Sequence, residues 1–232
     1  MELHTLTEDV EMAILSHGLL SFGIGNQSKL DKIELKEIIG EENIFDLLFE
    51  GRGKFDEFPK WTSVGEFVFT FEIDIGAYRD IQRHRVGLQT VSDWNAEFGY
   101  SIPKVLEEPG MEYLKLLYTA HCEEVKKIVD SLYKYDRFNA AYFLILGNNV
   151  ACSYTMNLRQ AAYFIELRSG PSGHYSYRTL AQEMFKLLER DVPNFAKYIR
   201  VDMSGYSDRR EAEERIQEKI NKIALEKPKA GF

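Results

Sequence analysis

The run Phe67-Val-Phe-Thr-Phe-Glu-Ile-Asp-Ile75 decides the fold, and the basic triplet Arg83-His84-Arg85 follows it closely. Apolar and polar residues alternate in this run and aromatic side chains dominate it, which predicts a β-strand around residues 64–75. Residues 76–86 are expected to form a helix that contains the triplet. Two guanidiniums and an imidazole within three residues suit an anion such as phosphate, because arginine offers a planar fork of donors. A solvated basic turn is the competing interpretation.

The composition bounds what surrounds this stretch. The 232 residues are 44% hydrophobic, so a sizeable core is expected, and without a visible repeat or linker a single domain over residues 1–232 is the economical interpretation. The net charge of -8 argues against non-specific nucleic-acid binding. The N-terminus lacks the pattern of a signal peptide, and no apolar run is long enough to span a membrane. We therefore expect a cytoplasmic protein with neither nucleic acid nor membrane as a partner.

The cysteines and histidines give little sign of a metal site. Cys122 and Cys152 are the two cysteines, so a cage of thiolates around zinc is excluded, and no pair of histidines has metal-ligand spacing. We expect no metal. A disulfide stays open, although reduced thiols are the simpler expectation. His121, on the apolar face of a predicted helix, is expected in a core or an interface, whereas His174 follows a Gly-rich turn and is a better site candidate.

Further helices are predicted from apolar residues at three- and four-residue spacing. Residues 87–109 are expected to form an irregular loop, and the apolar run 140–146 a buried helix or strand. The predicted helices cover residues 8–20, 32–50, 112–133, 158–168 and 175–189, with an amphipathic tail helix at 208–226.

A second group of polar residues lies at the two ends of the helix predicted at 158–168. Asn157 and Arg159 lie at its start and Arg168 at its end. The nine residues between the arginines turn the helix by about 900°, which puts them on opposite sides. Asn157 is explained equally well as a helix cap, and Arg168 as a cation that is favourable at a helix C-terminus.

Taken together, the two segments resemble the flavin-dependent thymidylate synthases, also called the thymidylate synthase complementing family. Phe69-Thr-Phe-Glu-Ile73 followed by Arg83-His84-Arg85 is similar to the family's strand and basic motif. Tyr154-Thr-Met-Asn157-Leu-Arg159 and Phe164-Ile-Glu-Leu-Arg168 are similar to its Asn-x-Arg and Phe-x-x-Leu-Arg helix. The convincing match runs from about residue 62 to 200.

The resemblance implies an α/β (α+β) domain with a central, mostly antiparallel sheet flanked by long helices, assembled as a homotetramer. It implies FAD as cofactor, NADPH as reductant, and a reaction in which methylenetetrahydrofolate methylates dUMP to dTMP. Carried over by position, the cofactor residues would be Arg83, His84, Arg85, Asn157 and Arg159, and the substrate residues Arg168, Ser101 and His174.

The chain also departs from the family pattern. The family's basic motif continues to a Ser and, two residues later, an Arg, but these positions hold Asp93 and Asn95 here, with Ser92 one residue early. A gapped alignment with Glu97-Phe-Gly-Tyr-Ser101 also lacks the Arg and the first Ser. An acid at either place would repel a nucleotide phosphate. Other differences are Phe67 in place of a His, Ala141-Tyr-Phe-Leu-Ile145 in place of an Arg-Leu-Pro segment, Ser172-Gly173-His174 in place of a Ser-x-Ala-Gln turn, and no recognisable opening strand.

Three hypotheses follow from the residues kept and lost. The first is an oligomeric, FAD-binding family member that makes dTMP. The second is a non-catalytic or substrate-altered relative that keeps the fold, the flavin site and the oligomer surface, either alone or as half of a two-domain protein. The third is another flavin or nucleotide enzyme on the same scaffold, with Asp93 or Glu97 near its ligand.

Overall fold

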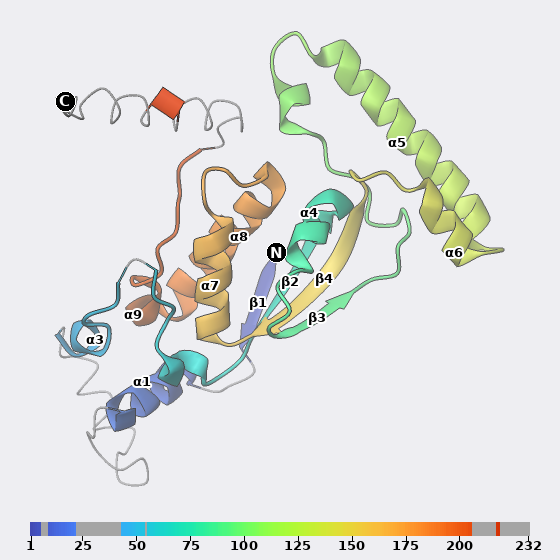
Figure 1. Ribbon diagram of the computed structural model, residues 1–232. Helices are drawn as coiled ribbons and strands as arrows, with labels where there is room; N and C mark the ends of the chain where they lie inside the picture. The colour runs from blue at the N-terminus through green and yellow to red at the C-terminus, as the bar shows by residue number, and fades with distance from the viewer. Residues whose placement is uncertain (6–8, 22–42, 54, 206–216, 219–232) are drawn as a thin grey trace, which may run out of the picture.

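A four-stranded antiparallel sheet lies at the centre of the protein (Figure 1). The computed structural model describes residues 1–5, 9–21, 43–53, 55–205 and 217–218. Helices cover one face of the sheet, so the predicted α+β class is confirmed. The strands, in the spatial order β1-β2-β4-β3, are β1 (Glu2–Thr5), β2 (Phe67–Asp74), β4 (Asn149–Met156) and β3 (Leu88–Val91).

The helices agree with most of the predicted ranges. Within the range 32–50 the structure describes only residues 43–50, most of which are helical. Within the predicted tail helix 208–226 it describes only residues 217–218. No described helix is long and apolar enough to cross a membrane. The helices are α1 (Val10–Ser21), α3 (Asn43–Leu48), α4 (Ile75–Ile81), α5 (Glu112–Tyr133), α6 (Arg137–Ala140), α7 (Leu158–Arg168), α8 (Tyr175–Asp191) and α9 (Pro193–Ala196), with short 3-10 turns at Lys60–Ser63, Lys104–Glu107 and Ala141–Phe143.

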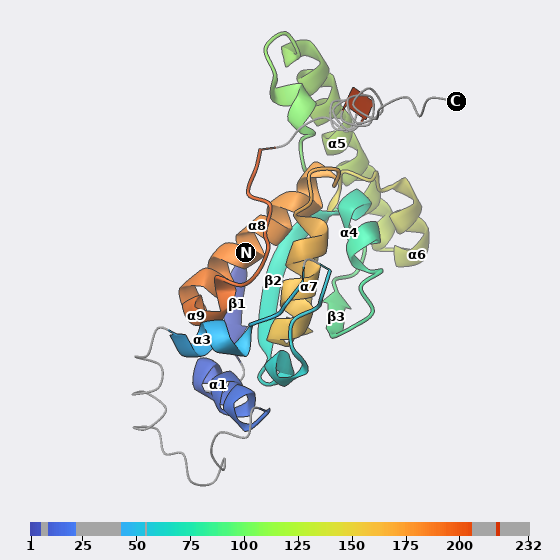
Figure 2. The same ribbon diagram turned by 60° about the vertical axis from the view of Figure 1, so that its left-hand side comes forward.

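The aromatic run forms β2 as predicted, and its alternation separates the two faces of the sheet. Phe67, Phe69 and Phe71 point to the helical face and are buried, while Thr70 and Glu72 point to the other face. Burying each large apolar side chain contributes roughly 1.5–3 kcal/mol. The core between sheet and helices therefore depends on this strand, against which α8 packs (Figure 2).

The helix α7 begins where the sequence places it, directly after β4. Asn157 accepts a hydrogen bond from the backbone N–H of Gln160 (3.0 Å), and the Gln160 side chain accepts one from the backbone N–H of Asn157 (3.0 Å). This reciprocal capping box satisfies two N–H groups that the first turn leaves without helical partners. The cap explains why the chain turns sharply from strand to helix here.

The basic triplet does not lie on a helix, which corrects the prediction for residues 76–86. Asp74 caps α4 by accepting a hydrogen bond from Ala77 (2.7 Å), and the helix ends at Ile81. The triplet is part of the turn that leads into β3. Residues outside regular structure are freer to point their side chains toward different neighbours, and those of this triplet do.

Three further expectations are wrong. An opening strand exists, because β1 pairs with β2, with Leu3 opposite Phe69. The segment 87–109 contains the edge strand β3, which pairs with β4. The apolar run 140–146 is not buried as a whole, since Tyr142 is exposed. Short edge strands give weak periodic signals, which is why the sequence does not reveal them.

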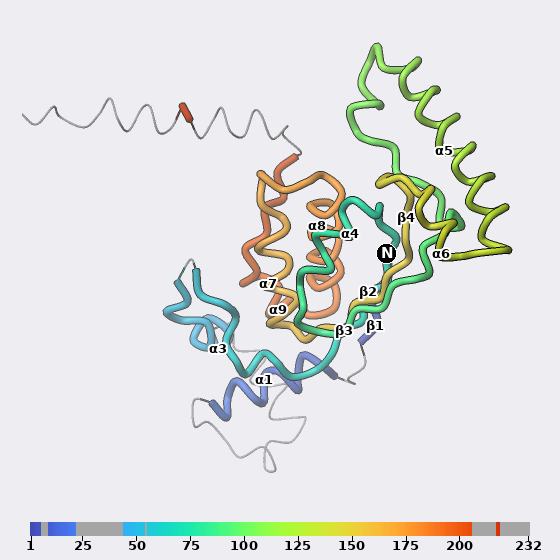
Figure 3. The backbone as a smooth tube through the Cα atoms, turned by 45° about the vertical axis from the view of Figure 1, so that its right-hand side comes forward, coloured from blue at the N-terminus to red at the C-terminus, as the bar shows by residue number. Residues whose placement is uncertain are grey.

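The long helix α5 stands away from the sheet at one end of the molecule (Figure 3). A small separate core joins it to the remainder through Ala96, Val125, Val129 and Ala140. His121 is exposed, so its interpretation as a core residue is wrong. Both cysteines are buried and free, which agrees with the expectation of reduced thiols.

Candidate functional site

The C-terminal ends of α4 and α7 meet at the basic triplet. The Nε of Arg168 donates a hydrogen bond to Nε2 of His84 (2.7 Å), and its Nη2 donates to the carbonyl oxygen of Asp80 (2.9 Å). The guanidinium also lies over the ring of Tyr177, 5.1 Å from its centroid. A cation is stabilised beside the carbonyl groups at a helix C-terminus, and here one cation serves two helices.

His84 is the buried member of the triplet. Its side chain packs on Phe164, with ring centroids 4.8 Å apart. Burial, and then the nearby charge of Arg168, lower the pKa of His84 from 6.5 to about 4. The imidazole is therefore neutral at physiological pH. Because arginine can only donate, Nε2 of His84 is the acceptor and the ring proton is on Nδ1.

The backbone of the triplet is also fixed. The Tyr154 hydroxyl lies 2.9 Å from the carbonyl oxygen of His84 and 2.6 Å from that of Val86, and donates between them. The side chain of Gln89 donates to the same His84 oxygen (2.5 Å). Gly87 closes the turn with a φ of +88°, a value that favours glycine.

The two arginines of the triplet point to solvent. Arg83 forms an exposed ion pair with Asp80 (3.2 Å). Arg85 is exposed and has no partner within the described part of the chain. Both guanidiniums keep donors for an anionic ligand, whereas His84 does not face outward. The triplet that the sequence presents as one unit is thus divided in the structure.

Asn157 and Arg159 lie at the opposite end of α7 from Arg168. Arg159 donates to the carbonyl oxygen of Phe58 (3.0 Å) and pairs with Glu57. A hollow of about 510 Å³ lies near this end; Asn157, Glu66 and Gly87 of the turn after the triplet line it, and no Arg, Lys or His side chain does. The two arginines contact different partners, as their spacing predicts, and the role of Asn157 as a cap is seen directly.

Ser101 and His174 have structural partners of their own. The Ser101 hydroxyl donates to Asn149 (2.7 Å), and its carbonyl oxygen accepts from the hydroxyl of Tyr118 (2.9 Å). His174 caps α8, where Nδ1 accepts a hydrogen bond from the backbone of Ser176 (3.3 Å). The structure brings neither side chain into hydrogen-bond contact with the Arg168–His84 pair.

Asp93, which occupies the motif serine position, has partners within the chain. Its carboxylate accepts from the Tyr133 hydroxyl (2.9 Å) and pairs with Arg137 (3.3 Å). The hydrogen bond to Asp93 raises the pKa of Tyr133. Asn95 accepts a local bond from the backbone of Glu97 (2.9 Å). Asp93 therefore connects its loop to α5 and α6 through contacts at the surface.

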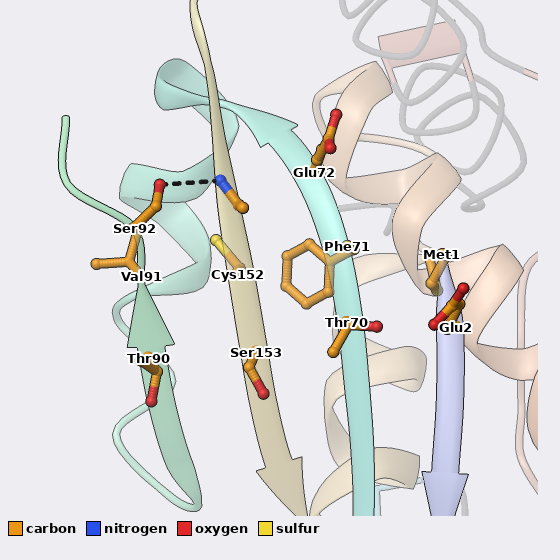
Figure 4. A pocket seen from close by; sticks show the side chains of 11 residues that line it. Met1, Glu2, Thr70, Phe71, Glu72, Thr90, Val91, Ser92, Cys152 and Ser153 are labelled. Carbon is orange, nitrogen blue, oxygen red and sulfur yellow. Dashed lines mark hydrogen bonds between the residues drawn. The ribbon is translucent and has the colours of Figure 1, made fainter. Parts of the chain in front are cut away.

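A larger hollow, of about 720 Å³, lies on the face of the sheet opposite the buried phenylalanines of β2 (Figure 4). Glu2 and Glu72 line it, and no Arg, Lys or His side chain does. The hydroxyl of Ser92 faces β4 there and accepts a hydrogen bond from the backbone of Ala151 (3.2 Å). Two carboxylates make this hollow unsuitable for an anion, so the candidate site is the cluster around Arg168 on the other face.

Two members of the cluster were not predicted from the sequence. Asp80 supplies both a carboxylate for Arg83 and a carbonyl for Arg168, and Tyr177 supplies a ring face. The three-residue spacing of Asp80 and Arg83 is a signal for their ion pair. The contact between Tyr177 and Arg168 depends on the turn between α7 and α8, which the sequence does not specify.

A family model described as "Thymidylate synthase complementing protein" matches residues 60–194, more than half of the chain. The chain belongs to this family. The match contains β2, the basic triplet, β4, α7 and α8, so the elements that build the cluster are the family's own.

Curated relatives are UPF0159 proteins. The one from Chlamydia muridarum is 33% identical over 151 residues, which are 63% of this chain and 27% of that protein. The one from Chlamydia pneumoniae is 26% identical over 191 residues, 81% of this chain and 35% of the relative. The one from Thermoplasma acidophilum is 31% identical over 144 residues, which are 60% of this chain and 28% of that protein. The chain thus spans about a third or less of their length.

Proposed function

We propose that the protein binds FAD and dUMP and converts dUMP to dTMP, with methylenetetrahydrofolate as carbon donor and NADPH as reductant. Membership of the thymidylate synthase complementing family supports this proposal. The single observation that favours retained ligand binding is the state of Arg168. Its guanidinium is fixed by His84 and Asp80, yet both N–H groups of Nη1 are without a protein partner among the described residues.

Two of the proposed cofactor residues could contact a dinucleotide. Arg83 and Arg85 present two exposed guanidiniums, which suit the pyrophosphate of FAD. Bound FAD would supply the hydride chemistry, while the chain supplies binding and orientation. Arg168 would hold a phosphate or a uracil oxygen of dUMP through Nη1.

We also propose that the protein is a homo-oligomer, with a tetramer as the expected form. Leu114 and Leu117 lie on one side of α5 and are 50% and 49% exposed, which leaves apolar surface of this helix in solvent. Contiguous exposed apolar surface is typical of subunit contacts. Tyr142 and Phe143 add to the exposed apolar surface in the segment that follows α6.

A non-catalytic relative is the second candidate. The observation that favours it is the pairing of Asp93 with Arg137, because the family's motif has a serine where Asp93 stands. Such a protein would keep flavin and assemble normally, yet form no dTMP.

Three measurements on the full chain separate the two candidates. Flavin absorption after incubation with FAD tests the cofactor, NADPH oxidation stimulated by dUMP tests the reductive half, and chromatography tests for dTMP. All three are expected to be positive. Flavin without dTMP supports the second candidate, and a protein that takes up no flavin contradicts both.

A further inference from the structure

The basic triplet contains one residue that faces away from the solvent. The side chains of Arg83 and Arg85 are exposed, whereas His84 is 6% exposed and its ring packs against Phe164. A side chain so enclosed has little surface to offer a cofactor. Its polar contact to a side chain is the hydrogen bond from Arg168.

The donors of Arg168 are divided between the protein and the solvent side. A guanidinium has five N–H groups and no acceptor. Nε–H donates to His84 and Nη2 donates to the carbonyl oxygen of Asp80, while one face of the plane lies over Tyr177. These three contacts fix the plane of the guanidinium. They leave the Nη1 edge without a partner in the described part of the chain.

The acceptor in this arrangement is itself held on three sides. Tyr154 and Gln89 hold the His84 carbonyl group, and Phe164 supports the ring. A hydrogen bond from a charged donor is short and directional, and 2.7 Å agrees with that. The direction of the Arg168 head group is therefore determined before any ligand arrives, which reduces the entropy lost on binding.

We propose that His84 is a positioning residue, which as a neutral imidazole with its proton on Nδ1 fixes the Arg168 guanidinium so that its Nη1 edge binds the uracil nucleotide. The identity of this ligand rests on the proposed function. Arg83 and Arg85 then serve the cofactor, and His84 serves the substrate through Arg168. The triplet connects the two binding sites.

Two substitutions of His84 separate positioning from cofactor contact. In His84→Gln the amide oxygen can accept a hydrogen bond near the former Nε2, whereas His84→Leu offers no acceptor. We expect His84→Leu to bind dUMP at least tenfold more weakly, measured by calorimetry, with unchanged FAD content. His84→Gln should recover most of the affinity. His4→Leu, at an exposed histidine on β1, is the matched control.

Two results with the His84 variants overturn the proposal. One is a folded His84→Leu variant that binds dUMP as tightly as the wild type. The other is loss of FAD and dUMP together in both variants, which would return His84 to the cofactor. A wild-type protein that takes up FAD but does not bind dUMP also overturns it.

The protonation state of the two ring nitrogens of His84 gives a second test. This test depends neither on a folded His84→Leu variant nor on enzymatic activity. The chain has five histidines, and the His84 signals are those missing from His84→Gln in a ¹⁵N histidine spectrum. We expect a proton on Nδ1, an accepting Nε2 and no protonation at pH 6. A proton on Nε2, or a charged ring, overturns the positioning role even in an active enzyme. An inactive or flavin-free protein with the expected spectrum contradicts the proposed function alone.

Discussion

The turn after the basic triplet depends on a single glycine. A Cβ at Gly87 would lie 2.5 Å from the carbonyl oxygen of Thr155 in β4, and the residue has a φ of +88°. Both the contact and the backbone angle oppose any other residue. Since the His84 carbonyl is held just before this turn, a shift here would also move the site.

Gly87→Ala should lower the free energy of unfolding by about 2–4 kcal/mol, through backbone strain and the clash with β4. Gly110→Ala is the control, because Gly110 has a φ of +89° but no atom within 4 Å of the added Cβ. Urea unfolding of both variants checks this. Equal losses for the two would mean that the clash contributes nothing.

The neutral state of His84 predicts a pH dependence of stability. Its pKa is about 4 in the folded protein and 6.5 without burial, so the unfolded chain gains a proton first as the pH falls. Stability due to this group is complete above pH 6.5 and decreases toward pH 4, by on the order of 2–3 kcal/mol. The His84→Gln variant should lose less free energy of unfolding than the wild type over this pH range, as measured by urea titrations. Parallel curves for wild type and variant would contradict the assignment.

The site residues show how far sequence reasoning reaches at this scale. The motif identified Arg83, His84, Arg85 and Arg168 as a set, and two of them do touch. It could not show that His84 points inward, because that direction is decided by Phe164 and the turn at Gly87. Burial and rotamer choice follow from packing, and spacing along the chain does not contain that information.

At the scale of elements, α8 is joined to its surroundings by a buried arginine. Arg178 is 2% exposed, and its guanidinium donates to the carbonyl oxygens of Ser169, Ser204 and Gly205 at 2.8–3.1 Å. One side chain thus joins α8 to the end of α7 and to the chain that follows α9. Nothing in the sequence distinguished Arg178 from a surface arginine.

Arg178→Met should lower the free energy of unfolding by about 3 kcal/mol, because three carbonyl groups lose their donor in a buried place. Arg190→Met on the same helix is the control, since Arg190 is exposed and pairs with the adjacent Asp191. Its cost should stay below about 1 kcal/mol. Denaturant unfolding checks both, and similar costs would show that the Arg178 contacts are dispensable.

Elements with strong patterns were predicted and those with weak patterns were not. The alternation in Phe67–Asp74 predicted β2, and the apolar residues at three- and four-residue spacing in Glu112–Tyr133 predicted α5. The short strands Glu2–Thr5 and Leu88–Val91 were missed, because four residues at the sheet edges contain too little periodicity. Their pairing is decided by β2 and β4, which lie far away in the sequence.

At the scale of the molecule, the exposed apolar surface of α5 predicts assembly. Changing Leu114 and Leu117 together to Glu should convert the oligomer to monomers, because two charges would be buried at the contact. Leu47→Glu on α3 is the control, at a leucine that is 44% exposed and distant from α5. Light scattering after size-exclusion chromatography gives the mass. A monomeric wild type, or an oligomer unaffected by the double change, would contradict this surface.

The central claim, that the two arginines of the triplet bind flavin, is tested most directly by an absorption spectrum. The wild-type chain incubated with FAD and desalted should keep the flavin bands, and Arg83→Ala with Arg85→Ala should lose them. The control variant, Lys186→Ala with Arg190→Ala, removes two exposed cations from α8. It should keep the flavin bands. A colourless wild type, or a triplet variant with undiminished flavin and an unchanged melting temperature, would contradict the claim.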